Sequence, residues 1–299
     1  SRPPSEEEGG RFLALMQKAV KDDGAKDGVR DTLATVNHVA LNRGAKRPIF
    51  ALWGTNQFLK LNGNEDYNLE PIGEGNTTKG WRATYDDNTT GGIIRVIKEF
   101  NPAEGFLMTN VVIRIKNLTA NKVMVPSLHV ALGSSTPAGM GKLSDAMYHG
   151  VFWFDGNEDT HYEQGDFANR TLGCFPGTAQ ERFTAGNKNV RWTAVHNQFY
   201  TIIAMVPEGG LVPDTVTARH IDFGPDASTQ EKAQNRYLAS VNYRNEIEKL
   251  AGLDPNEEWS VTFDLYAGPK KYRDLEALSI DRGNNQVDRV MDLGGFFGF

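Results

Sequence analysis

Cysteine is nearly absent from this sequence: Cys174 is the only one among 299 residues. A single cysteine excludes an internal disulfide and a cysteine-based zinc site. A chain of this length does not need disulfides for stability, so both the cytosol and the periplasm remain compatible with it. We interpret Cys174 as a small buried hydrophobic residue rather than a nucleophile.

Long apolar runs and clusters of basic residues are also missing. No stretch reaches the roughly 20 apolar residues of a membrane-spanning helix, and no signal peptide is recognisable. The formal net charge of −6 argues against a non-specific nucleic-acid binder, which needs clustered Lys and Arg. With 39% hydrophobic and 23% charged residues, the chain has enough apolar material for a sizeable core.

Motifs of catalysis and metal binding are missing as well. The six histidines form no H-x-x-x-H or H-x-H pair, and no G-x-S-x-G elbow occurs. Asp155, Asn157 and Asp159 have calcium-loop spacing, but Thr160 and Asp166 replace the expected Gly and Glu. A solvated acidic hairpin loop is the preferred interpretation, and a calcium loop the alternative. We therefore predict no catalytic residue, cofactor or metal.

Period-two hydrophobicity is what the sequence does contain. Residues 109–117, 127–132 and 259–267 alternate apolar and polar side chains, as half-buried antiparallel strands do. Residues 235–252 predict a strand followed by a short helical turn. Turn-forming residues separate these segments, which indicates sheet packed on sheet from residue 32 to 267. Residues 1–31 are predicted as an acidic leader with one short helix.

A change of period marks the C-terminal region. We expect the strand to end at Tyr266–Ala267, and Gly268, Pro269 and Lys270 to form a hinge in which Gly268 takes a positive φ. Pro269 is expected to block ladder pairing and to open a helix. In that helix the apolar side is predicted to consist of Tyr272, Leu275 and Leu278.

Several of these segments resemble one family. "WSVTFDLYAGPKKYRDLEAL" (259–278) followed by "VDRVMDLGGFFGF" (287–299) resembles the end of the extracytoplasmic domain of YidC-type membrane protein insertases. "WTAVHNQFYTIIAMVP" (192–207) and "VVIRIKNLTANKV" (111–123) are similar to earlier strands of that domain, whereas "LNRGAK" (41–46) keeps only one glycine of a usual pair. The resemblance runs from residue 32 to 299.

The resemblance implies a mainly β fold, a galactose-mutarotase-like β-supersandwich of antiparallel sheets with a C-terminal helix. It implies a non-catalytic domain, itself soluble, on the periplasmic face of the bacterial inner membrane, within a multi-pass protein whose membrane core lies outside this chain. The implied partners are Sec-translocon accessory subunits and nascent membrane proteins, without nucleic acid. Residues 268–299 would lead toward the membrane.

The last residues give a further expectation. Phe296, Phe297 and Phe299 stand in a glycine-rich tail with no polar residue among them. We expect residues 287–299 to pack poorly on the sandwich and these rings to contact the membrane surface, with packing into the core as the alternative.

A carbohydrate-binding or mutarotase-like domain is the alternative function. Such a site would combine a histidine and a carboxylate with an aromatic platform on a concave sheet face. The candidates that the sequence offers are His129, His196, Trp192, Trp153 and Tyr200.

Overall fold

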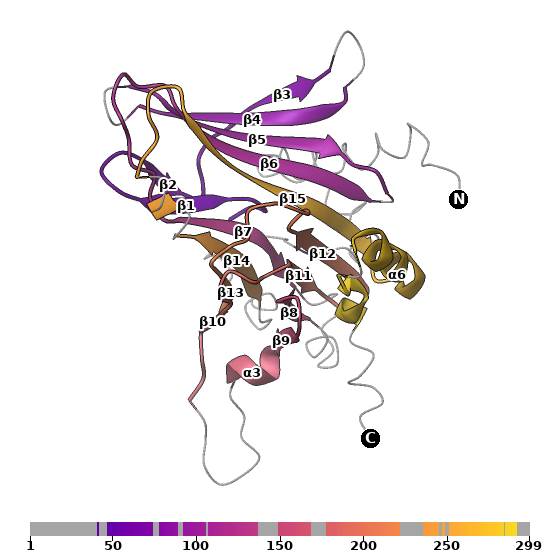
Figure 1. Cartoon of the computed structure of the whole chain (residues 1–299). Helices are drawn as coiled ribbons and strands as arrows, with labels where there is room; N and C mark the ends of the chain where they lie inside the picture. Colours follow the sequence, from indigo (N-terminus) through magenta and orange to yellow (C-terminus); the bar gives the residue numbers. More distant parts are fainter. Residues whose placement is uncertain are drawn as a thin grey trace, which may run out of the picture.

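Two antiparallel β-sheets packed face to face form the framework of the protein (Figure 1). The computed structural model describes residues 41, 47–73, 78–88, 92–105, 107–136, 149–168, 178–221, 236–244, 247–248, 251–283 and 285–291. The predicted leader (1–31), Cys174 and the three terminal phenylalanines therefore lie outside the described residues. All strand pairs within the described ranges are antiparallel.

The smaller sheet has six strands and the larger one nine. In spatial order the six are β10 (Arg182–Ala185), β13 (Thr215–His220), β14 (Tyr237–Tyr243), β7 (Leu128–Ser135), β1 (Leu52–Thr55) and β2 (Lys60–Asn62). The nine are β3 (Asn68–Ile72), β4 (Gly80–Asp87), β5 (Ile94–Pro102), β6 (Met108–Asn117), β15 (Glu258–Pro269), β12 (Tyr200–Met205), β11 (Trp192–His196), β8 (Gly150–Phe154) and β9 (Asp159–Glu163).

Among the described residues, α3 (Gln164–Ala168) follows β9, α6 (Tyr272–Asp281) follows β15, and the 3-10 helix η3 (Val287–Met291) follows α6. Ile247 and Glu248 are helical after β14, as predicted for that segment. The predicted β-supersandwich of antiparallel sheets with a C-terminal helix is confirmed. Within the described ranges, no helix is both long and apolar enough to cross a membrane.

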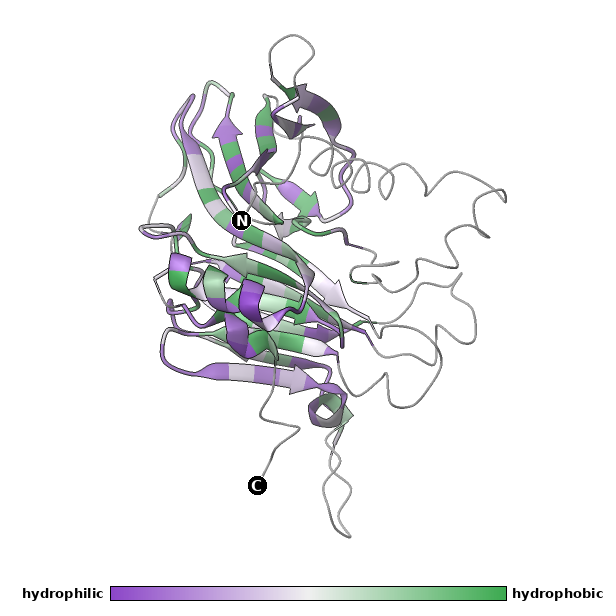
Figure 2. Cartoon of the chain, turned by 90° about the vertical axis from the view of Figure 1, so that its right-hand side faces the viewer, coloured by the Kyte–Doolittle hydropathy of each residue, from purple (hydrophilic) through white to green (hydrophobic). Residues whose placement is uncertain are grey.

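The main core lies between the inner faces of the two sheets. On β6, Val111, Ile113 and Ile115 are fully buried, while Arg114 and Lys116 on the other face are partly exposed. Such alternation is visible along the strands of Figure 2 as successive green and purple segments. The period-two signal thus identified the strands correctly because one face of each packs on the opposite sheet.

The outer face of the nine-stranded sheet is divided into two regions. Over β8, β11, β12 and β15 it is covered by α6 and η3, and the contact forms a second hydrophobic cluster that includes Phe152, Phe154, Trp192, Leu275 and Val290. Strand β11 is consequently buried on both faces. Over β3, β4, β5 and β6 the outer face carries charged side chains instead.

The C-terminal strand differs from the prediction. β15 runs through Pro269, pairing Gly268 with Thr201 and Pro269 with Tyr200. The strand accepts the proline because successive backbone N–H groups point to opposite neighbouring strands. The N–H of Ala267 donates to Leu107 on the β6 side, whereas the N–H of Lys270 donates to Phe199 on the β12 side. The nitrogen of Pro269 therefore faces the β6 side, where ladder pairing ends at Tyr266.

The helix after this strand was predicted in the right region, and its apolar side was right at Leu275 and Leu278 but wrong at Tyr272. α6 begins at Tyr272 rather than at Pro269, with Lys271 as its N-cap residue. Leu275 and Leu278 are buried, as expected, but Tyr272 is 44% exposed and Ser279 is buried in its place. Tyr266, predicted to face outward, is buried because α6 and η3 cover that face.

Candidate functional site

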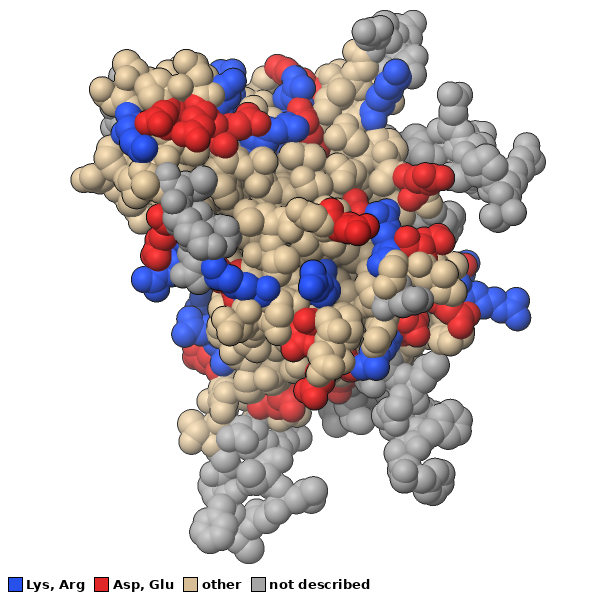
Figure 3. Space-filling model, in the orientation of Figure 1, with Lys and Arg blue, Asp and Glu red and all other residues tan. Residues whose placement is uncertain are grey.

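A charged groove of about 950 Å³ lies on the outer face of β3, β4, β5, β6 and β15. Basic and acidic side chains lie next to one another along the upper part of the molecular surface in Figure 3. The lining residues are Asp66, Asn68, Glu70, Arg82, Thr84, Tyr85, Asp86, Arg95, Ile97, Glu99, Arg114, Lys116 and Glu258.

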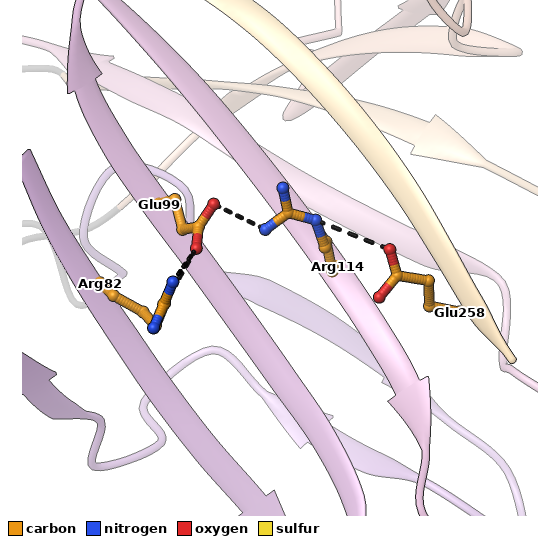
Figure 4. A network of polar contacts seen from close by, with 4 residues as sticks. All are labelled: Arg82, Glu99, Arg114 and Glu258. Carbon is orange, nitrogen blue, oxygen red and sulfur yellow. Dashed lines mark hydrogen bonds and ion pairs between the residues drawn. The ribbon is translucent and has the colours of Figure 1, made fainter. Parts of the chain in front are cut away.

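Four of these residues form a ladder of ion pairs across neighbouring strands (Figure 4). One carboxylate oxygen of Glu99 accepts from Arg82 Nε at 2.8 Å and the other from Arg114 Nη1 at 2.6 Å. Arg114 Nε lies 3.7 Å from Glu258 Oε1. Burial raises the pKa of Glu99, but the hydrogen bonds from Arg114 and Arg82 outweigh it, so the net pKa is lowered.

A second ion pair, between Arg95 and Asp86, lines the neighbouring part of the groove. Arg95 donates through Nε and Nη2 to the two oxygens of Asp86, each at 2.7 Å. This bidentate geometry lowers the pKa of the Asp86 carboxyl. Both side chains are held in fixed positions on a sheet, so the groove presents preformed polar groups rather than mobile ones.

The chemistry of the groove favours binding over catalysis. Among the described residues its lining includes no histidine, cysteine or serine, and two of its carboxylates, Asp86 and Glu99, are hydrogen-bonded to arginines. Across the described residues, no group of three or more His, Cys, Asp or Glu side chains could hold a metal ion. Alternating guanidinium and carboxylate groups suit a polar, extended ligand such as a polypeptide.

The acidic segment with calcium-loop spacing is a hairpin turn between β8 and β9. Asp155 Oδ1 accepts the backbone N–H of Asn157 at 2.8 Å and of Glu158 at 2.7 Å. These bonds lower the pKa of the Asp155 carboxyl and occupy the oxygen that a cation would need. The preferred interpretation as an acidic hairpin loop fits this geometry.

The predicted hinge depends on close packing and not on backbone strain. Gly268 has no positive φ, so the predicted conformation is wrong. A Cβ at this position would instead lie 2.4 Å from Leu107 Cδ1 and 2.9 Å from the Tyr266 hydroxyl oxygen. Tyr266 donates that hydroxyl to the carbonyl of Pro269 at 2.8 Å, which fixes the strand end before α6.

Lys270, the last hinge residue, lies beside two histidines, His196, which is buried, and His161, which is partly buried. Its Nζ lies 3.4 Å from Nδ1 of His196, and Nε2 of His196 lies 2.8 Å from Nε2 of His161. His161 stacks on Phe152, with ring centroids 4.2 Å apart. Burial first, and then Lys270, lower the pKa of His161 to about 4, so both rings are neutral near pH 7.

The five residues of the predicted sugar site do not form one site. His196 and Trp192 are buried on the face under α6 and η3, and Trp153 is buried between the sheets. Tyr200 lies at the end of β12. His129 belongs to the other sheet, where it stacks on Trp53. His161 Nε2 is 3.5 Å from Glu163 Oε1, but no exposed tryptophan stands beside this pair.

The C-terminal prediction is wrong for the part that the structure describes. Residues 287–291 form η3, and Val287 and Val290 are fully buried against the sheet. They pack there because α6 turns back and brings Asn285 to Trp192, whose Nε1–H donates to the Asn285 carbonyl at 2.7 Å. Phe296, Phe297 and Phe299 remain an untested expectation.

Sequence reasoning missed the charged groove and the Trp53–His129 stack. A partial signal was present, since the alternation placed Arg114 and Lys116 outward on β6. The complementary Glu99 and Glu258 are 15 and 144 positions away from Arg114 in the numbering, and only strand register brings them opposite. Nothing in the local pattern around Trp53 predicted a partner on β7.

Comparison with known proteins agrees with the family resemblance. A model of the YidC periplasmic domain family matches residues 60–299. No curated protein sequence matches the chain. Similar solved structures include a putative aldose 1-epimerase from Escherichia coli K12, with 12% identity over 73% of this chain and 81% of that chain and a TM-score of 0.38.

Two galactose mutarotase-like proteins are also similar. The one from Lactobacillus casei ATCC 334 has 10% identity over 76% of this chain and 80% of that chain, with a TM-score of 0.41. The one from Clostridium acetobutylicum has 9% identity over 69% of this chain and 67% of that chain, with a TM-score of 0.38. At these values no activity is transferred to this chain.

Proposed function

The chain belongs to the YidC periplasmic domain family, and we propose that it is a non-catalytic domain that assists the insertion and folding of inner-membrane proteins. The family places it on the extracytoplasmic side of the membrane. Its proposed partners are accessory subunits of the Sec translocon and nascent membrane proteins. The family is not known as an enzyme family.

The observation that supports a contact role is the surface around α6. Ile280 is 62% exposed and Tyr272 44% exposed, two helical turns apart on α6. Phe199 is 49% exposed, and its carbonyl accepts the N–H of Lys270 just before the helix. Large apolar side chains exposed together on a rigidly packed helix are typical of a surface that contacts a partner.

Site-specific photocrosslinking tests this proposal. A photoreactive residue would replace Ile280 or Tyr272 in the domain expressed as part of its insertase, during synthesis of an inner-membrane protein. The matched control replaces Leu69, which is 43% exposed on β3, far from α6 in the sheet order. We expect crosslinks to the nascent chain or to a Sec accessory subunit from α6 and none from Leu69. Equal labelling at both places, or none at either, would contradict the proposal.

The carbohydrate alternative is tested on the same chain. We expect no acceleration of sugar anomer exchange. Acceleration that is lost on His129→Ala or His196→Ala would restore a mutarotase-like function.

A further inference from the structure

Three arginines lie near one another at the six-stranded sheet. Arg182 and Arg219 stand directly opposite each other on β10 and β13. Arg47 precedes β1, and burial together with the charge of Arg219 lowers the pKa of its guanidinium. His129 lies near both Arg47 and Arg182, whose charges add to burial in lowering its pKa. We call Arg47, Arg182 and Arg219 the arginine cluster.

The arginine cluster has little internal compensation. In the part of the chain that the structure describes, neither Arg182 nor Arg219 makes an ion pair or a side-chain hydrogen bond. Glu65 attracts Arg47; its Oε1 accepts the N–H groups of Asn62 and Gly63, while its Oε2 is buried and makes no hydrogen bond among the described residues. Like charges directly opposite on neighbouring strands destabilise a sheet, so the arrangement is unfavourable in the free protein.

One member of the cluster is held rigidly by aromatic rings. The rings of Trp53 and His129 stack nearly parallel, with centroids 5.1 Å apart and an interplanar angle of 4°. The guanidinium of Arg47 lies over Trp53, 4.4 Å from the ring centroid. Stacking on an indole leaves the guanidinium edge free to pair with an anion and fixes its orientation before binding.

We propose that the arginine cluster binds an acidic segment of another polypeptide, with two or more carboxylates pairing with Arg47, Arg182 and Arg219. Arg182 and Arg219 are on adjacent strands, with Cα atoms about 5 Å apart. Two guanidinium groups at this spacing fit successive carboxylates of an acidic chain better than they fit one small anion. Arg and Trp together also characterise the energetic centres of protein interfaces.

A lipid surface is the less suitable partner. Insertion at a membrane interface requires exposed apolar side chains beside the cations. The exposed large apolar residues of the described chain are Leu69, Met124, Phe199, Tyr272 and Ile280, and none lies on the six strands of this sheet. Trp53 is partly buried and stacked flat instead of projecting outward.

Fluorescence anisotropy with a labelled oligoglutamate peptide tests the proposal on the whole chain. The test variant is Arg182→Gln/Arg219→Gln. The matched control is Lys79→Gln/Arg191→Gln, which makes the same change in net charge at exposed positions outside the six-stranded sheet and away from α6. We expect the test variant to bind about tenfold more weakly and the control within about twofold of the original chain, at about 25 mM salt.

The conformation of the test variant is checked by thermal unfolding. Its midpoint should equal or exceed that of the original chain, because the repulsion between Arg182 and Arg219 is removed. Equal peptide affinity of the two double variants would overturn the proposal. So would binding to phosphatidylglycerol vesicles that depends on the cluster while oligoglutamate fails to bind. Peptide binding is measured on the isolated chain, so it is independent of the crosslinks expected at α6.

Discussion

The indole Nε1–H of Trp192 donates to the backbone carbonyl of Asn285, 2.7 Å away and 93 residues later in the chain. This bond joins β11, in the interior of the large sheet, to the segment between α6 and η3. Asn285 Nδ2 also lies 3.5 Å from the sulfur of Met205 on β12. The C-terminal region is therefore part of the folded domain at least as far as Met291, where η3 ends.

The first prediction concerns this packing. Val287→Ala/Val290→Ala should destabilise the domain by roughly 2–4 kcal/mol, because both side chains are fully buried against the sheet and truncation leaves cavities. Urea unfolding measures the effect. Asp288→Ala on the same 3-10 helix is the control and should change stability by about 0.5 kcal/mol or less. An unchanged urea midpoint for the double variant would show that η3 does not pack on the sheet.

A second prediction follows from the space around Gly268. Gly268→Val should cost roughly 1–3 kcal/mol, because a Cβ would overlap Leu107 Cδ1. Gly165→Ala on α3 is the control: nothing lies within 4 Å of its Cβ position, and helical Gly→Ala is neutral or stabilising. If close packing is the cause, adding Leu107→Ala to Gly268→Val should recover part of the loss. No recovery would point back to backbone conformation.

The sequence predicted the burial of a strand residue correctly where the opposite sheet covers that residue. It failed where a helix from another part of the chain covers it. β6 was predicted in full because its alternation of Val111, Ile113 and Ile115 with polar residues reflects one buried face. β15 was predicted correctly only in its first part, since Tyr266 is buried by α6 and η3. Periodicity reports burial against a sheet, but it does not reveal a covering helix from elsewhere in the chain.

The candidate sites were less predictable than the strands. Arg114 was expected to face outward, yet its pairing with Glu99 and Glu258 depends on strand register, which hydrophobic alternation leaves open. The sugar-site candidates depend on the same kind of information: His196 and Trp192 share β11 on a face that α6 and η3 cover, whereas His129 lies on the other sheet. Residue type identified possible chemistry, but the strand order decided which residues meet.

The third prediction tests the ladder of ion pairs in the charged groove. Arg114→Ala should destabilise the domain by about 1–2 kcal/mol, because Glu99 is largely buried and loses its 2.6 Å partner. Arg244→Ala is the control: its pair with Glu248 is exposed on both sides, so its loss should change stability much less. Equal effects of the two substitutions in urea unfolding would indicate that the groove pairs are no more than surface contacts.

The last prediction concerns acid stability and the buried histidine pair. Nζ of Lys270 lies 3.4 Å from Nδ1 of His196, and Nε2 of His196 lies 2.8 Å from Nε2 of His161. At that distance one proton fits between the two Nε2 atoms, so a second proton there would face the first. This contact is consistent with the low pKa of His161, about 4, for which burial and Lys270 are the main causes.

The low pKa of His161 determines how the stability of the domain changes with pH. The unfolded chain has a histidine pKa of about 6.5, so it takes up the proton before the folded chain does. The stabilisation is fully present above about pH 6.5 and is lost as the pH falls toward about 4. By about pH 5 we expect His161 to account for a loss on the order of 1–2 kcal/mol. Urea midpoints between about pH 8 and pH 5 measure it. His161→Gln and His161→Phe should both flatten this dependence, the second while keeping the stack on Phe152. A dependence equally steep in both variants would mean that other groups cause the acid sensitivity.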